Sequence, residues 1–179
     1  MTLEEVKMCF LTAIKDEEKG MKHKGLLIEK PSHEKAEEYI LKAKEELEVC
    51  GYFKQRGTDY KIPEQWYYTL YYCALAILAK FGVESRSQRC TALFIQYLQD
   101  KGLIEYEKEF IDMILVYKEK DKKSEVDRRE EARYGSWIKN EEVRSRYNLM
   151  IDICKKAISK AEEIIYSKKE CKVPEELLL

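Results

Sequence analysis

Arginines gather in the segment RREEARYGSW, residues 128–137, where their side chains suit the recognition of phosphate. Arg128 and Arg129 are adjacent, and Arg133 lies four residues after Arg129, so Arg129 and Arg133 share one face of a helix. The planar guanidinium group binds a phosphate through two parallel hydrogen bonds. The segment therefore predicts a phosphate-binding patch. The alternative is a solvated helix surface on which these arginines pair with neighbouring glutamates.

A second candidate patch lies earlier in the chain, where Arg86 and Gln88 stand at the start of an expected helix. A helix N-terminus attracts anions, because its first N–H groups have no acceptor inside the helix. The patch is either a second edge of the same phosphate site or an ordinary polar helix start. The basic stretch KGMKHKG, residues 19–25, could contact a nucleic-acid backbone, although such stretches are more often flexible connections.

The chain as a whole has no excess charge that would draw it to a polyanion. Its 179 residues include 33 lysines and arginines against 34 aspartates and glutamates, a formal net charge of −1. Any nucleotide or nucleic-acid site must therefore be a local patch. Charged residues make up 37% of the chain, against about 25% in an average globular protein, which is typical of long solvated helices.

The six cysteines and two histidines give no metal-binding pattern. The cysteines lie far apart without a CxxC pair, and His23 and His33 are too few for a structural zinc site, so we expect no metal and no cofactor. Most of the cysteines occupy apolar helix positions, which predicts buried reduced thiols and a cytoplasmic location. The first residues are not typical of a signal peptide, and no apolar run is long enough to span a membrane.

Glycine and proline are scarce, with 7 and 3 residues, so we expect an all-α fold. Hydrophobic periodicity and helix-end signals locate its elements. The expected helices cover residues 2–18, about 32–50, 66–82, about 85–100, a segment from about 103, and about 140–167, with loops at 20–31 and 51–63. This pattern predicts a bundle of five or six helices, four of them forming the core.

The segment WYYTLYYCALAILAKFG, residues 66–82, is apolar almost all the way round. A helix without a polar face belongs in the middle of a bundle or between two copies of one. Its tyrosines, Tyr67, Tyr68, Tyr71 and Tyr72, carry hydroxyl groups that need partners when buried. We expect most of them in the core, and the alternative places one or two at a subunit boundary.

Four segments, taken in order, resemble the HEPN domain, the helical family named for higher eukaryotes and prokaryotes nucleotide-binding. HEKAEEYILKAKEELE (33–48) is similar to the family's opening helix, and WYYTLYYCALAILAKFGVES (66–85) to its aromatic second helix. RSQRCTALFIQYL (86–98) and RREEARYG (128–135) are similar to the segments that follow. The resemblance covers about residues 32–167, most of the chain.

The resemblance implies an up-and-down four-helix bundle that forms a homodimer. Many members are metal-independent ribonucleases, or toxins paired with a small nucleotidyltransferase. Their catalytic motif is an arginine followed, after four to six residues, by a histidine that acts as acid or base while the arginine holds the phosphate. Here Tyr134, Gly135 and Ser136 stand where that histidine would follow Arg129, and Gln88 stands where many relatives carry a histidine. The usual acid–base residue is therefore missing.

Tyr134 has two interpretations. In relatives that are silenced by their nucleotidyltransferase partner, a tyrosine just after the arginine motif receives the nucleotide. The resemblance therefore makes Tyr134 a candidate for modification, and the alternative is a packed aromatic residue beside Gly135.

We expect a single HEPN-like domain over residues 1–179, with a four-helix core at about 32–167, one or two extra helices, and a tail at 168–179. The main hypothesis is a homodimer that binds a nucleotide or RNA. The resemblance places it in a toxin–antitoxin or defence pair with a nucleotidyltransferase, without standard nuclease activity.

Two other functions remain open. The enzyme alternative is a metal-independent endoribonuclease with a non-standard site, in which Arg129 acts with Tyr134 or Ser136 in place of the histidine. The interaction alternative is a helical adaptor that recruits a protein through its charged segment 118–133 and its terminal leucines.

Overall fold

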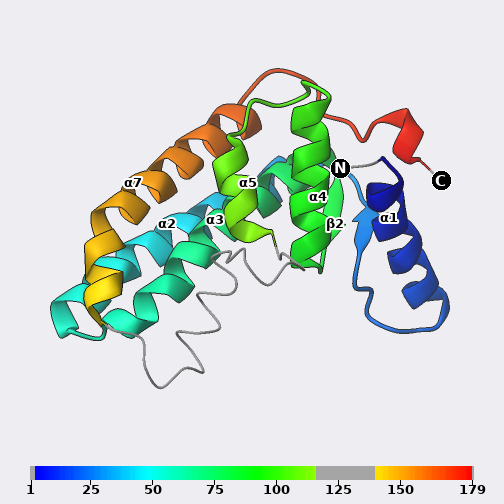
Figure 1. Ribbon diagram of the computed structural model, residues 1–179. Coiled ribbons are helices and arrows are strands. Elements are labelled where there is room, and N and C mark those ends of the chain that lie inside the picture. The colour runs from blue at the N-terminus through cyan, green and yellow to red at the C-terminus, as the bar shows by residue number, and fades with distance from the viewer. Residues whose placement is uncertain (1–2, 116–139, 179) are drawn as a thin grey trace.

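The structure is a computed structural model that describes residues 3–115 and 140–178, and over these residues the fold is all-α with one short two-stranded ribbon (Figure 1). The helices are α1 (Leu3–Glu18), α2 (His33–Arg56), α3 (Ile62–Phe81), α4 (Gln88–Asp100), α5 (Lys108–Ile114) and α7 (Asn140–Ile165). The shorter elements are the 3-10 turns η1 (Asp59–Lys61) and η2 (Glu175–Leu177) and the strands β1 (Leu26–Ile28) and β2 (Val83–Ser85). The predicted fold class is confirmed. The up-and-down topology and the domain bounds stay predictions.

Helix α3 lies at the centre of the fold, where α2, α7, α4 and α5 all pack against it (Figure 1). Most of its apolar side chains are buried, with Trp66, Tyr67 and Ile77 each 0% exposed. Burying one such side chain contributes about 1.5–3 kcal/mol. A central helix is what the apolar sequence predicted. Among the described residues, no helix is both long and apolar enough to cross a membrane.

The tyrosines of α3 divide between the core and its edge. Tyr67 is fully buried, whereas Tyr68, Tyr71 and Tyr72 pack against the core and keep part of their surface exposed. The ring of Tyr72 stacks on Tyr68, at a centroid distance of 5.9 Å, and on Tyr39 of α2, at 6.1 Å. A full core position is therefore confirmed for Tyr67 alone.

Helix α2 begins where the sequence predicted and ends later. Ser32 is its N-cap, with Oγ accepting a hydrogen bond from the Lys35 N–H at 3.1 Å. The predicted end near Cys50 is wrong, because the helix continues through Gly51 and stops only at Gly57, whose φ of 71° is the left-handed conformation that terminates helices.

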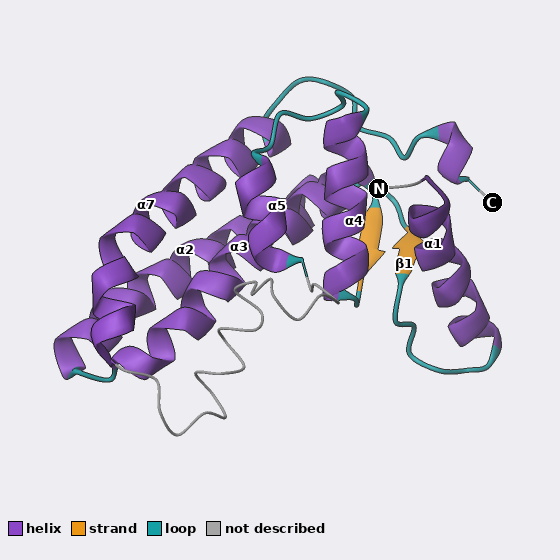
Figure 2. Cartoon of the chain, viewed as in Figure 1, coloured by secondary structure: helices purple, strands orange, loops and turns teal. Residues whose placement is uncertain are grey.

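The predicted loop 20–31 contains strand β1, which pairs with β2 in an antiparallel ribbon (Figure 2). Leu26 pairs with Ser85, and Ile28 pairs with Val83. Gly82 precedes β2 with a φ of 74°, and a Cβ there would lie 2.6 Å from the Glu29 carbonyl. Glycine is therefore required at this position, and strands of only three residues are too short to show the alternating pattern that predicts a strand from sequence.

Cys9 of α1 and Cys90 of α4 form a disulfide, with their Cα atoms 5.8 Å apart. The prediction of reduced thiols is therefore wrong for this pair, because spacing along the chain gave no sign that two residues separated by 81 positions would meet. Cys50, Cys73 and Cys171 are buried thiols, as predicted. Burial raises the pKa of Cys50 to about 12, so this thiol stays protonated and unreactive.

The end of the chain packs against the rest of the fold. Leu177 is 0% exposed, and its turn η2 contacts α1. Glu176 accepts hydrogen bonds from the Tyr97 hydroxyl and the Lys101 ammonium, both at 2.6 Å. Leu177 is therefore packed inside the fold and is not exposed for a partner, as the adaptor alternative requires of the terminal leucines.

Candidate phosphate-binding site

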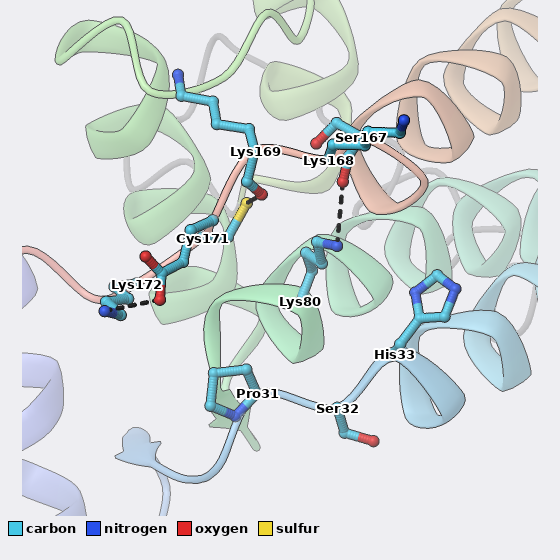
Figure 3. A pocket seen from close by; sticks show the side chains of 10 residues that line it. Pro31, Ser32, His33, Lys80, Ser167, Lys168, Lys169, Cys171 and Lys172 are labelled. Carbon is cyan, nitrogen blue, oxygen red and sulfur yellow. Dashed lines mark hydrogen bonds and ion pairs between the residues drawn. The ribbon is translucent and has the colours of Figure 1, made fainter.

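A cavity of about 510 Å³ lies between the start of α2 and the segment that follows α7 (Figure 3). Residues 31–33 form one wall, and residues 167–172 form the other. Lys80, in the last turn of α3, projects between the two walls. Three segments far apart in the sequence therefore enclose one hollow.

The N-terminus of α2 is fixed at this cavity by a hydrogen bond to α3. The Ser32 N–H donates to the Ala79 carbonyl at 3.0 Å, which holds the first turn of α2 beside Lys80. The first turn of a helix presents N–H groups without an intrahelical acceptor, and the helix dipole adds about half a positive charge. Since α2 is 24 residues long, this dipole is fully developed at the cavity wall.

Lys80 is half-buried, and its ammonium group is directed at the opposite wall. The Lys80 Nζ donates to the Ser167 carbonyl at 3.4 Å (Figure 3). An ammonium group has three donors, so this bond leaves capacity for an anion in the cavity. The lysine therefore joins the walls and brings a cation into the space between them.

Three more lysines surround the cavity, which is lined by four lysines and one glutamate in all. Lys169 Nζ donates to the Leu103 carbonyl at 3.3 Å and points away from Lys80, and Lys172 pairs with Glu170 at 2.7 Å (Figure 3). These lysines raise the local positive potential without converging on one point. The cavity is thus electropositive in a chain whose net charge is −1.

Cys171 also lines the cavity. Burial raises the pKa of this thiol, although the nearby Lys80 and Lys169 act in the opposite direction. Its Sγ donates to the Lys169 carbonyl at 3.5 Å. A protonated, hydrogen-bonded thiol is a poor nucleophile, so the geometry favours binding over covalent chemistry.

The candidate residues from the sequence are not brought to this cavity. Arg128, Arg129, Arg133 and Tyr134 lie outside the described residues. Arg86 donates through Nε to Glu84 at 2.7 Å, and Gln88 is the first residue of α4 behind the Ser87 cap. For Arg86 and Gln88, these contacts favour the ordinary polar helix start over a second edge of a phosphate site.

His23 belongs to a polar cluster at the β1–β2 ribbon. Residues 19–25 were expected to be a flexible connection, and this expectation is wrong for His23, which is buried. The side chain is 4% exposed, with Nε2 lying 3.4 Å from Glu84 Oε1 and Nδ1 accepting from the Gly25 N–H at 3.4 Å. Both ring nitrogens are engaged, so His23 has no nitrogen directed at a substrate. Hydrogen bonds from Glu29, Arg86 and His23 lower the pKa of Glu84 to about 2.

In residues 3–115 and 140–178, no group of three histidine, cysteine, aspartate or glutamate side chains is arranged to hold a metal ion. Lys80 and the wall at residues 167–172 were not among the site residues predicted from the sequence. One signal was present, because three lysines occur within residues 168–172, directly after the last helix. Nothing local indicated that this run faces the start of α2.

Comparisons of the chain with protein-family models, with curated proteins and with solved structures found no match. The resemblance to the HEPN domain therefore rests on the four sequence segments alone.

Proposed function

We propose that this protein binds a phosphate-bearing ligand, a nucleotide or RNA, in the cavity around Lys80. The observation that carries the proposal is that the Lys80 side chain and the N-terminus of α2 line the same cavity. A cation and a helix N-terminus that face the same space form a combination that stabilises a phosphate group.

The size and charge of the cavity support this ligand class. Small-molecule sites usually have volumes of about 300–1,000 Å³, and the cavity volume of about 510 Å³ falls in this range. Four lysines and one glutamate line the cavity, so its local charge would attract an anion. The chain as a whole, with a net charge of −1, would not. Binding should therefore weaken as salt concentration rises.

The wider setting follows from the HEPN resemblance. We propose a cytoplasmic homodimer that works with a nucleotidyltransferase in a toxin–antitoxin or defence pair. The half-exposed rings of Tyr39, Tyr68 and Tyr72 support a dimer surface along α2 and α3, because aromatic side chains are enriched at interfaces. The Cys9–Cys90 disulfide removes part of the reason for a cytoplasmic location, since reducing compartments disfavour disulfides.

Arg128, Arg129 and Arg133 remain proposed contacts for the phosphates of a longer RNA, on the strength of the sequence alone. The endoribonuclease alternative needs a proton carrier. Of the two histidines, only His33 borders the cavity, and its Nε2 lies 3.4 Å from Glu37 Oε1. This position gives the alternative one residue to test.

The proposal is tested by mixing purified protein with labelled single-stranded RNA or with AMP in EDTA, at low and at moderate salt. We expect binding of both ligands that weakens steeply with salt, and no cleavage. Cleavage that is lost in His33→Ala or in Arg129→Ala would establish the ribonuclease instead. Binding that is absent at every salt concentration would contradict the proposal and leave the adaptor alternative.

A further inference from the structure

Two aromatic rings stand together at the edge of the cavity. His33 lines it at the start of α2, and Tyr166 directly precedes Ser167, whose carbonyl accepts the hydrogen bond from Lys80. The two ring centroids are 5.3 Å apart, with the ring planes at 80°, an edge-to-face arrangement. His33 therefore lines the cavity itself, and Tyr166 is the chain neighbour of the residue that Lys80 contacts.

The two rings share one carboxylate neighbour, Glu37. Glu37 lies one turn after His33 on α2, and its Oε1 is 3.4 Å from His33 Nε2. The phenol of Tyr166 also hydrogen-bonds to Glu37, which raises the pKa of Tyr166. Both rings thus contact the same carboxylate of α2.

Both rings are exposed to solvent. Tyr166 is 54% exposed and lies among the large apolar side chains that the described fold leaves at its surface. An edge-to-face pair leaves ring faces uncovered, and a flat aromatic ligand stacks on such a face. Stacking of a nucleobase on an aromatic side chain is sequence-tolerant, because every base has a π-face.

We propose that the ligand of the cavity carries a nucleobase that stacks on Tyr166, so that the site recognises a nucleoside monophosphate unit rather than phosphate alone. This inference rests on the proposed function, which supplies the phosphate contact at Lys80 and the start of α2. The unit is either a free nucleotide or the phosphorylated end of an RNA.

The test compares the affinities of AMP, ribose 5-phosphate and adenosine for the full chain by isothermal titration calorimetry. We expect AMP to bind roughly tenfold more tightly than ribose 5-phosphate, as a single stacked base provides. Tyr166→Ala should remove this advantage and leave ribose 5-phosphate binding unchanged, while Tyr166→Phe, which keeps the ring, should retain it. Tyr52→Ala is the matched control, because Tyr52 is 52% exposed at the other end of α2.

Equal affinities for AMP and ribose 5-phosphate in the wild type, or an AMP advantage that survives in Tyr166→Ala, would overturn the stacking inference and leave phosphate binding in place. Adenosine that binds as tightly as AMP, with loss in Tyr166→Ala, would instead overturn the phosphate function and keep the stacked base. Absence of binding by all three ligands would overturn both. Circular dichroism of each variant shows that it is folded.

The source of the nucleotide unit is separated by a second titration. A short single-stranded RNA with a 5′-phosphate is compared with the same RNA bearing a 5′-hydroxyl and with AMP. If the ligand is an RNA end, the RNA with a 5′-phosphate should bind more tightly than AMP, and the RNA with a 5′-hydroxyl should bind more weakly than the phosphorylated one. A free nucleotide predicts that AMP binds more tightly than either RNA. RNA binding that does not respond to the 5′-phosphate or to Tyr166→Ala would overturn recognition of a terminal unit.

Discussion

The Lys80 ammonium of α3 donates a hydrogen bond to the Ser167 carbonyl, at 3.4 Å and across 87 positions of the chain. The bond ties the central helix to the segment that leaves α7, and it crosses the cavity that we assign to a phosphate. Because this hydrogen bond already restricts the Lys80 side chain, less conformational entropy is lost when an anion binds there. Lys80 therefore both connects α3 to the segment after α7 and supplies the cation of the proposed phosphate site.

Gly82 should tolerate substitution less well than Gly57, although both end helices with nearly the same φ, 74° and 71°. Alanine at either position must adopt the left-handed conformation, which costs about 1–2 kcal/mol of stability. At Gly82 the new Cβ would also lie 2.6 Å from the Glu29 carbonyl, whereas nothing lies within 4 Å at Gly57. Urea unfolding should show Gly82→Ala to be the more destabilised variant by at least about 1 kcal/mol. Equal losses would mean that the close approach of the Glu29 carbonyl to Gly82 is absent.

Arg144→Ala should destabilise the protein by about 1–3 kcal/mol, because it leaves the buried carboxylate of Asp59 without its ion-pair partner. Asp59 is 1% exposed and accepts from Arg144 Nε and Nη2 at 3.1 and 2.9 Å, which fixes the start of α7 to η1. Thermal unfolding of the double variant Asp59→Asn/Arg144→Ala is the control. The double variant should be more stable than Arg144→Ala alone. If its loss of stability equals the sum of the losses in Asp59→Asn and Arg144→Ala, the ion pair between the two residues does not stabilise the fold.

Glu84 should contribute stability that depends on pH. Its pKa is lowered from 4.5 to about 2 in the folded protein, so its stabilising effect is present above about pH 4.5 and is lost as the pH falls towards 2. Glu84→Gln should therefore lower the melting temperature at pH 7, and the difference from the wild type should shrink at pH 3. A difference that is the same at both values would show that the charge of Glu84 plays no part.

Reduction of the Cys9–Cys90 disulfide should destabilise the fold. The disulfide closes a loop of 81 residues, and a cross-link of this length stabilises a protein by up to about 4.5 kcal/mol in the chain-entropy model. The melting temperature should fall on addition of dithiothreitol, and Cys9→Ala should melt at the reduced value with or without it. Cys73→Ala, at a buried thiol, should keep its response to dithiothreitol.

The sequence predicted those elements whose signals are local. Ser32 and Gly82 mark helix ends through their own side chain or backbone freedom, and the apolar run of α3 could only be buried. The disulfide and the cavity were not predictable in this way. Lys80, His33 and Ser167 come together only because three helix ends pack at one place, and no residue near them in the chain signals that meeting.

The most direct test of the account is the affinity of AMP for Lys80→Ala, measured by calorimetry beside the wild type and Lys15→Ala, which removes an exposed lysine from the end of α1. Loss of one charge-assisted contact to phosphate should weaken binding by roughly 10- to 100-fold, with Lys80→Arg retaining part of it. Lys15→Ala should bind as the wild type does. AMP affinity that is unchanged in Lys80→Ala, or reduced equally in both alanine variants, would contradict a phosphate site at this cavity.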